Sequence, residues 1–110
     1  MMITNQPFDA TDKQLLIDME TLERVAPIIR HAAHPLRLRI LDYLQHEDAE
    51  RTVGSIVHAT GAEQAIVSQQ LRILKDQNIL TARRDGVNVL YRINDRSVLL
   101  LLECIRCHRC

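Results

Sequence analysis

The sequence is poor in aromatic residues and carries no excess charge of either sign. It contains no Trp, one Phe and two Tyr among 110 residues, although 46% of its residues are hydrophobic. Its core must therefore be built from Leu, Ile and Val, and this composition is typical of a compact globular chain. The formal net charge is zero, which argues against a protein that coats nucleic acid by bulk electrostatics.

Long apolar runs are also missing. The longest covers residues 98–102, far below the roughly 18 residues of a membrane span. The chain does not begin with a charged segment followed by an apolar stretch, so we predict no secretory signal, no membrane partner and a cytoplasmic location. The only cysteines are Cys104, Cys107 and Cys110, unlike the distributed disulfide frameworks of secreted domains, and this favours a reducing compartment.

Charge is distributed unevenly along the chain. Residues 1–60 carry six Lys or Arg against nine Asp or Glu, and residues 61–110 carry eight against five. Contacts with phosphate are therefore expected in the second part. We predict a single domain over residues 1–110, and because a domain of this size buries only a modest share of its surface, we expect it to form an oligomer.

Apolar residues at helical spacing predict two long helices in the first half. The first begins near Thr11, ends near Arg30 and carries more apolar surface than one small core needs. Pro27 is expected to bend or restart it, because proline has no amide hydrogen. Pro35 suits the first position of the second helix, and the charged residues 46–51 form its exit loop.

Residues 52–77 have the pattern of a helix-turn-helix. Thr52 can cap a short helix, Gly61 suits the left-handed residue that ends it, and a second helix follows over about 63–77. The second helix has an apolar side and a polar side, as expected of a helix packed on a core. Two short helices joined by a tight glycine turn define this motif.

The pattern changes to strands after residue 78. Two runs with alternating apolar residues flank Asp85-Gly86, the signature of a tight hairpin, so residues 79–93 are predicted to form a two-stranded wing. Asn94 or Asp95 can cap a last helix over 96–107. The predicted fold is mainly α with a small β-hairpin (α+β): a winged helix-turn-helix with about five helices.

The second helix of the motif carries the residues expected to contact DNA. Such a helix lies in the major groove, with its N-terminal half at the base edges. Gln64, Ser68 and Gln69 project from that half, and glutamine can bond the N6/N7 edge of adenine. Arg72 and Lys75 lie further along the same face and are better placed for phosphates.

Three arginines belong to the predicted wing. Arg83 and Arg84 precede its turn and Arg92 follows it, so together they would form a cationic finger on the backbone or in the minor groove. A polar helix face taken alone is usually just solvated. The order of the elements, with a wing after a helix-turn-helix, favours binding to double-stranded DNA.

Three segments resemble the arsenical-resistance repressor (ArsR/SmtB) family of winged-helix regulators. Residues 31–41, HAAHPLRLRIL, are similar to the family's "HPxRLxIL". Residues 61–80, GAEQAIVSQQLRILKDQNIL, are similar to "GLSQSTVSHHLKVLREAGLV", and residues 83–93, RRDGVNVLYRI, to "RREGRxVYYRL". The resemblance covers about residues 20–93 in continuous order, and three linked motifs are more specific than any one of them.

The resemblance implies a homodimer with helices 11–31 and 96–107 at its interface. It also implies an operator in two half-sites and a transcriptional repressor that a chemical signal releases. The family's base-contacting positions fall on Gln64, Ser68 and Gln69, with Gln70 where a second histidine is common.

The sequence departs from the family pattern at three further positions, one at the start of the helix and two in the wing. Glu63 replaces the usual serine at the start of the helix, where its charge repels phosphate. Val87 and Asn88 stand where a wing-tip cation or aromatic residue is frequent. We therefore expect this wing to hold DNA less strongly.

The two metal-ligand sets common in the family are absent. The third helix, VGSIVHAT, has no cysteine, and Ser97 stands at the histidine position that would follow Asp95. This leaves the tail as the candidate sensor, with Cys104, Cys107, His108 and Cys110.

The tail allows three interpretations. On a helix, Cys104, Cys107 and His108 share one face, and with Cys110 they would suit a thiophilic metal or metalloid ion. Arg106 and Arg109 would favour thiolate, so oxidation to a disulfide is an equal alternative. In the third interpretation the cysteines only pack at a helix interface.

Two functions other than a DNA-binding regulator are the alternatives for this sequence. A dimeric interaction adaptor, built on a winged helix that has lost specific DNA binding, is favoured by the zero net charge and by Glu63. An enzyme is disfavoured because the sequence has no glycine-rich phosphate loop, no nucleophile with a recognisable base and no suitable carboxylate pair.

Overall fold

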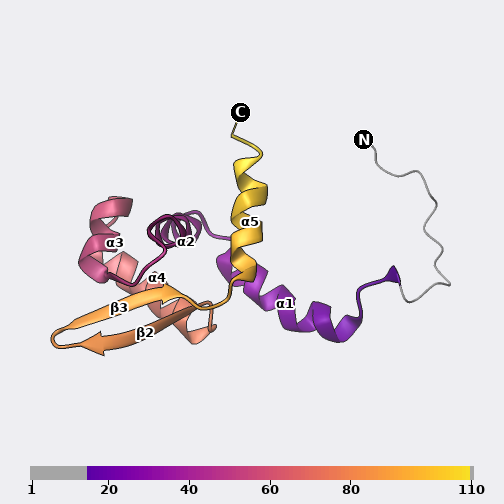
Figure 1. The fold of residues 1–110 in the computed structure, drawn as a ribbon, viewed down its shortest axis with the longest axis horizontal. Helices are drawn as coiled ribbons and strands as arrows, with labels where there is room; N and C mark the ends of the chain where they lie inside the picture. The colour runs from indigo at the N-terminus through magenta and orange to yellow at the C-terminus, as the bar shows by residue number, and fades with distance from the viewer. Residues whose placement is uncertain (1–14, 110) are drawn as a thin grey trace.

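The structure is a computed structural model that describes residues 15–109 (Figure 1). Within this range the elements are α1 (Met19–Ala32), α2 (Pro35–Glu47), β1 (Arg51–Thr52), α3 (Val53–Thr60), α4 (Gln64–Asp76), β2 (Leu80–Asp85), β3 (Asn88–Ile93) and α5 (Ser97–Arg106). The predicted class, mainly α with a small β-hairpin, is confirmed. No helix within 15–109 is long and apolar enough to cross a bilayer.

Helix α1 begins later than its apolar pattern predicts. Asp18 caps it, and its carboxylate accepts a hydrogen bond from the Thr21 amide at 2.9 Å. The predicted start near residue 11 is wrong for residues 15–18, which precede the helix; the earlier residues lie outside the described range. Pro27 lies inside α1 and does not restart it. The helix extends away from the body formed by α2, α3, α4 and the wing (Figure 1).

Helix α2 begins as the sequence predicts, with Pro35 in its first turn. Proline is tolerated there because a first-turn amide has no partner within the helix. His34 caps the helix, since its Nδ1 accepts a hydrogen bond from the Leu36 amide at 3.2 Å.

The helix-turn-helix is formed by α3 and α4. The Thr52 hydroxyl accepts a hydrogen bond from the Ser55 amide at 3.1 Å, which confirms Thr52 as the cap of α3. Gly61 ends α3 with a φ of +74° and donates its amide to the Val57 carbonyl at 2.9 Å. Because a side chain disfavours this left-handed conformation, glycine permits the short turn into α4.

The wing has one strand more than predicted. The sheet order is β1-β3-β2, and β1 pairs antiparallel with β3, with Arg51 opposite Tyr91. The end of the predicted exit loop is thus a strand. A strand of two residues is too short to produce an alternating pattern, and only its pairing in the folded chain defines it.

The hairpin turn lies one position later than predicted. Asp85 and Asn88 are paired across β2 and β3, so the two-residue loop is Gly86-Val87 and not Asp85-Gly86. Gly86 has a φ of +66°, and a positive φ at the first loop residue alone is the pattern of a type II′ turn.

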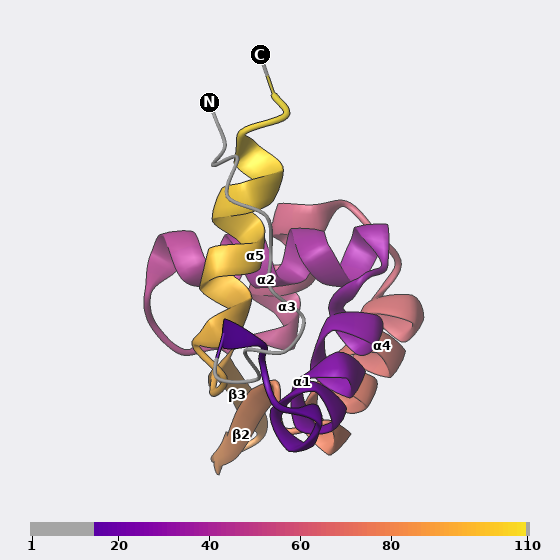
Figure 2. The same cartoon turned by 90° about the vertical axis from the view of Figure 1, so that its right-hand side faces the viewer.

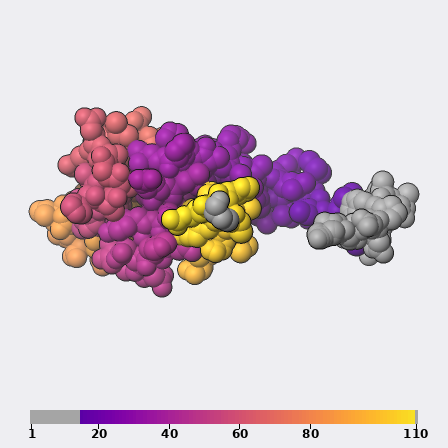
Figure 3. All heavy atoms as spheres, turned by 90° about the horizontal axis from the view of Figure 1, so that it is seen from above, coloured from indigo at the N-terminus to yellow at the C-terminus, as the bar shows by residue number. Residues whose placement is uncertain are grey.

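Helix α5 starts at Ser97 and packs on α2. Neither predicted cap holds the N-cap position, which is Arg96, but the Asp95 carboxylate just before it accepts a hydrogen bond from the Ser97 amide at 3.0 Å. The other end of α5 is held by an ion pair between Arg106 and Asp42 of α2. Figure 3 shows α5 at the surface, with α1 beside it and extending beyond it.

The core is aliphatic, as the composition requires. It lies where α2, α3 and α4 meet the first residues of β2 and the inner side of α5. Its members share an exposure of at most 4%: Ala32, Ile40, Leu41, Leu44, Ile56, Val67, Leu71, Leu74, Ile79, Leu80, Val98 and Leu102.

The turn between α3 and α4 gives a stability test. Gly61→Ala should lower the free energy of unfolding by about 1 kcal/mol, because alanine disfavours a positive φ. The matched control is Gly54→Ala in α3, where the added Cβ would lie 3.9 Å from the Thr52 hydroxyl. This control should be neutral or stabilising by up to about 1 kcal/mol. Equal losses for both variants in denaturant titrations would contradict the role of the turn.

Candidate nucleic-acid interface

Helix α4 has a fully buried side and a polar side in solvent. Val67, Leu71 and Leu74 have no exposed surface and hold the helix against the body. The predicted contact residues on this helix that lie in solvent are Gln64, Ser68, Gln69, Arg72 and Lys75. An amphipathic helix fixed by its apolar side presents the other side rigidly, which is what groove recognition requires.

The helical rotation orders these residues by how directly they face outward. At about 100° per residue, Gln69 and Arg72 lie opposite the buried stripe, whereas Gln64 and Lys75 lie toward its edge. Ala65 also lies at the centre of the exposed side. Its methyl group can contact thymine, and a pattern of polar residues alone does not predict such a position.

Gln70 was predicted to contact DNA, but the structure places it on the buried side of α4. Its side chain is 8% exposed. Its Oε1 accepts a hydrogen bond from the Arg37 Nε of α2 at 2.6 Å. The helical rotation turns this position toward α2, so Gln70 is a packing residue and not a base-contacting one.

The wing arginines lie on both faces of the hairpin. In an antiparallel pair, residues opposite each other share a face of the sheet and neighbours along a strand alternate. Arg83 is opposite Leu90 and Thr81 is opposite Arg92, so Arg83 and Arg92 share one face. Arg84 is opposite Val89 and lies on the other face, so the three arginines are divided between the two faces of the wing.

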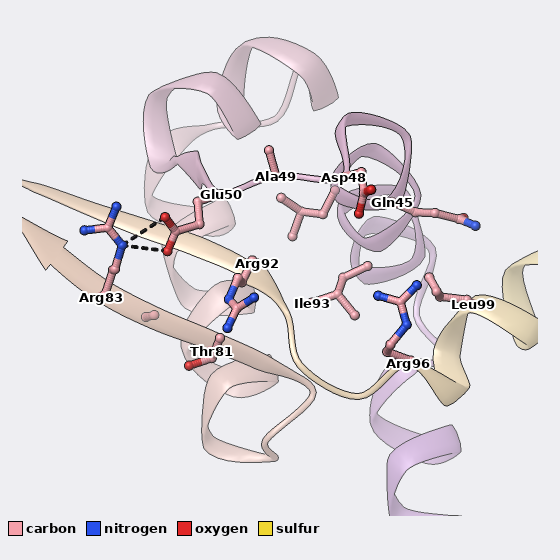
Figure 4. Close-up of a pocket in the computed structure, with 12 residues that line it drawn as sticks. Gln45, Asp48, Ala49, Glu50, Thr81, Arg83, Arg92, Ile93, Arg96 and Leu99 are labelled. Atoms are coloured by element: carbon pink, nitrogen blue, oxygen red, sulfur yellow. Dashed lines mark hydrogen bonds and ion pairs between the residues drawn. The ribbon is translucent and has the colours of Figure 1, made fainter.

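Arg83 is engaged by an acidic neighbour. Its Nε donates to both carboxylate oxygens of Glu50, at 2.9 and 2.8 Å (Figure 4). The hydrogen bond from Arg83 lowers the pKa of Glu50 below its usual 4.5 and raises the pKa of Arg83. Arg84 has no acidic partner among the described residues. Of the two adjacent arginines, Arg84 is therefore the one whose charge remains available to phosphate.

A groove of about 750 Å³ lies beside this ion pair, between the wing, the end of α2 and the start of α5 (Figure 4). Arg92 and Arg96 line it together with Glu50 and Asp48. Arg92 also helps to lower the pKa of Glu50. No ion pair joins Arg92 to Glu50 among the described residues, so this effect acts through the charge of Arg92 alone.

The described tail residues do not come together in the way that the sequence predicts. Cys104 is exposed on α5, but the helix ends at Arg106, so His108 follows the helix and does not share a helical face with the cysteine. Cys107 is also exposed, and Cys110 lies outside the described residues. Within 15–109, no group of three or more His, Cys, Asp or Glu side chains is placed to hold a metal ion.

Comparison with known proteins identifies this arrangement. The family model "Bacterial regulatory protein, arsR family" matches residues 34–82, which include α2, α3 and α4. The nodulation protein NolR of Rhizobium meliloti is 37% identical over 86 residues, covering 78% of this chain and 69% of NolR. The chain belongs to the ArsR family.

Solved structures of similar proteins extend the match to nearly the whole chain. The antimony-specific transcriptional repressor AntR is 32% identical, with a TM-score of 0.78 over 96% of this chain and 93% of AntR. The homodimeric winged helix-turn-helix DNA-binding domain of Mb0332 from Mycobacterium bovis is 31% identical, with a TM-score of 0.66 over 94% and 87%. The chain spans only 55% of the length of another relative, the transcriptional repressor SmtB of Mycobacterium tuberculosis.

The family assignment confirms the predicted resemblance. It makes this ArsR-family chain a DNA-binding transcriptional regulator and not an enzyme. Its helix-turn-helix is α3 and α4, and its wing is the sheet of β1, β2 and β3.

The contact between the wing and Glu50 has a measurable electrostatic consequence. We predict that Arg83→Gln raises the pKa of Glu50 toward 4.5, because the charged donor that favours the carboxylate is removed. The lowered pKa means that the pair stabilises the fold above the unfolded pKa, and that this contribution is lost as pH falls through the folded pKa.

An NMR titration of the Glu50 side-chain carboxyl measures this shift. Arg84→Gln is the matched control, since it removes the neighbouring charge on the opposite face and should leave the titration nearly unchanged. Identical Glu50 titrations in wild type and Arg83→Gln would exclude the pair in solution.

Proposed function

We propose that this chain is a transcriptional repressor that binds an operator in double-stranded DNA as a homodimer. The observation that carries the proposal is the polar side of α4, held outward by the fully buried Val67, Leu71 and Leu74. The similarity to AntR, which is itself a transcriptional repressor, supports the choice of repressor over activator. Because its proposed ligand is operator DNA, we place the protein in the cytoplasm.

The exposed side of α4 divides into two roles. We assign base contacts to Gln64, Ser68 and Gln69, because they lie in the first half of the helix and carry side chains that pair with base edges. Arg72 and Lys75 follow in the second half and are assigned to phosphates. Asp76 ends the helix on the same exposed side, and its charge limits phosphate contacts to the preceding turns.

The wing is assigned a sequence-independent role. Arg84 supplies charge for phosphate, whereas the contribution of Arg83 is reduced by its ion pair with Glu50. Arg92 is assigned a weaker contact for the same electrostatic reason. Val87 at the tip is 93% exposed and adds no charge. The α4 helix therefore dominates recognition, and the wing adds affinity.

The homodimer is supported by apolar surface that one protomer leaves in solvent. The exposed apolar residues on α1 and α5 are Met19, Leu22, Ile29, Leu100 and Ile105. Apolar side chains left in solvent on two helices that contact each other are typical of an interface. The Mb0332 domain, named as homodimeric, has the same fold. We propose that α1 and α5, predicted over residues 11–31 and 96–107, form this interface.

A two-fold dimer presents α4 twice. The operator would then be an imperfect palindrome with half-sites about 34–36 Å apart, or a multiple of that spacing. Each half-site would meet one α4 and one wing.

The signal that releases the operator is proposed to act at the tail. Cys104 and Cys107 are exposed, which supports a thiol reaction there. A bound thiophilic metal or metalloid ion is the second chemistry, and it would require Cys110 or a second protomer, because residues 15–109 of one chain supply no set of three ligands. His108 would be a further ligand only in that second case.

Two substitutions separate base recognition from backbone binding. Gln69→Ala should reduce the preference for the operator over random duplex by about 1–3 kcal/mol, because it removes a base contact. Arg84→Ala should weaken binding to both duplexes alike and reduce the salt slope by about 1, because it removes a phosphate contact. Arg83→Ala is the matched control and should have the smaller effect.

Fluorescence anisotropy on a duplex selected in vitro and on a random duplex measures both effects. Equal loss on the two duplexes for Gln69→Ala would refute its role as a base contact. Micromolar binding by wild type that is indifferent to sequence would favour the adaptor hypothesis instead.

The proposed interface gives a test of assembly. Leu100 is 75% exposed on α5, and Leu100→Asp should convert the dimer to monomer because a carboxylate would be buried at the interface. Val87→Asp is the matched control, since Val87 is even more exposed and belongs to the loop between β2 and β3, which lies far from α1 and α5 (Figure 1). Light scattering after size-exclusion chromatography decides: a dimeric Leu100→Asp protein would place the interface elsewhere.

A further inference from the structure

One guanidinium joins three helices. Arg37, in the first turn of α2, donates from Nε to Gln70 Oε1 of α4 at 2.6 Å. It also donates from Nη1 to the carbonyl oxygen of His31 in the last turn of α1, at 3.0 Å. Helices α1 and α4 are also in direct contact with each other (Figure 2). Arg37 thus bonds to both neighbours of α2 at once.

The His31 carbonyl depends on this donor. In a continuing helix its partner would be the amide four residues later, but that residue is Pro35, which has no N–H. Arg37 follows two residues after the proline and supplies the missing donor. The break between α1 and α2 and the bond that bridges it are therefore built from one short segment.

Gln70 depends on the same donor. Its side chain is 8% exposed, and it is the only buried polar residue in the part of the chain that the structure describes. A buried amide oxygen without a donor costs free energy, so the bond from Arg37 favours one placement of the side chain. Since Gln69 precedes Gln70 directly, a rotation of α4 that broke this bond would also turn the proposed base contact.

The link runs from the proposed dimer interface to the proposed DNA-contacting helix. Leu22 and Ile29 of α1 are 41% and 50% exposed and belong to the interface proposed above. In a two-fold dimer, the distance between the two copies of α4 depends on how each α4 is placed against its own α1. A planar guanidinium with two directed bonds resists changes in that placement better than a single contact does.

We propose that Arg37 is a positioning residue that fixes α4 against α1 and thereby sets the half-site spacing that the dimer accepts. This inference rests on the proposed function. It deepens that function by assigning the choice of spacing to a residue that contacts no base. Loss of Arg37 should affect spacing preference more than base preference.

The test compares Arg37→Lys with Arg39→Lys. Lysine keeps the charge but has no planar fork, so it cannot reproduce both bonds of Arg37. Arg39 lies in the same helix and is exposed, so its replacement controls for charge, helix and residue type. The probes are a palindromic duplex selected in vitro with the wild-type protein and two versions with the spacer changed by one base pair.

Wild type and Arg39→Lys should bind the selected spacing at least tenfold more tightly than the altered ones. Arg37→Lys should remain dimeric and lose about tenfold of that discrimination, the effect of one lost hydrogen bond to a charged group. If the spacing discrimination of Arg37→Lys lies within twofold of the wild-type value, the proposal is overturned. Restored discrimination in Arg37→Lys with Gln70→Glu, which pairs the ammonium with a carboxylate, would support it.

A second measurement needs no DNA and keeps the two proposals apart. Amide hydrogen exchange should increase in α4 and in the last turn of α1 together in Arg37→Lys, and in neither in Arg39→Lys. Unchanged exchange in Arg37→Lys would overturn the link itself. If instead the wild-type protein selects no duplex, the proposed function fails and the spacing role fails with it, whatever the exchange experiment shows.

Discussion

The burial of one stripe of α4 is the interaction on which the rest of the molecule depends. Val67, Leu71 and Leu74 pack without exposed surface against the body, and this fixes the rotation of the helix about its axis. Every outward side chain of α4 then has a set direction. A groove-binding helix needs this rigidity, because base contacts discriminate only when donors and acceptors are held in register.

The surrounding elements reinforce that orientation. Gly61 lets α3 turn into α4 without a long loop, and Arg37 bonds the inner side of α4 to the end of α1. The aliphatic core continues into the first residues of β2, so the wing starts from a buried base. Helix α4 and the wing are therefore parts of one packed unit.

The distribution of charge explains how a neutral protein can bind a polyanion. The outer side of α4 and Arg84 supply local positive charge, whereas Glu50 engages Arg83 and Asp76 closes the contact side. Such an arrangement gives limited nonspecific attraction, which agrees with the proposal that α4 provides the specificity. In the proposed homodimer, a second copy of the chain covers the exposed apolar side chains of α1 and α5 and doubles the contact with DNA.

The local features of this chain were determined by its sequence alone. The cap at Thr52, the turn at Gly61, the first-turn proline and the apolar stripe of α4 depend on contacts within a few residues, so periodicity and residue type suffice to predict them. Only the tertiary structure decided the rest. The strand β1, the ion pair of Arg83 with Glu50 and the burial of Gln70 each depend on a partner 33 to 40 positions away in the chain, and no local pattern encodes which partner that is.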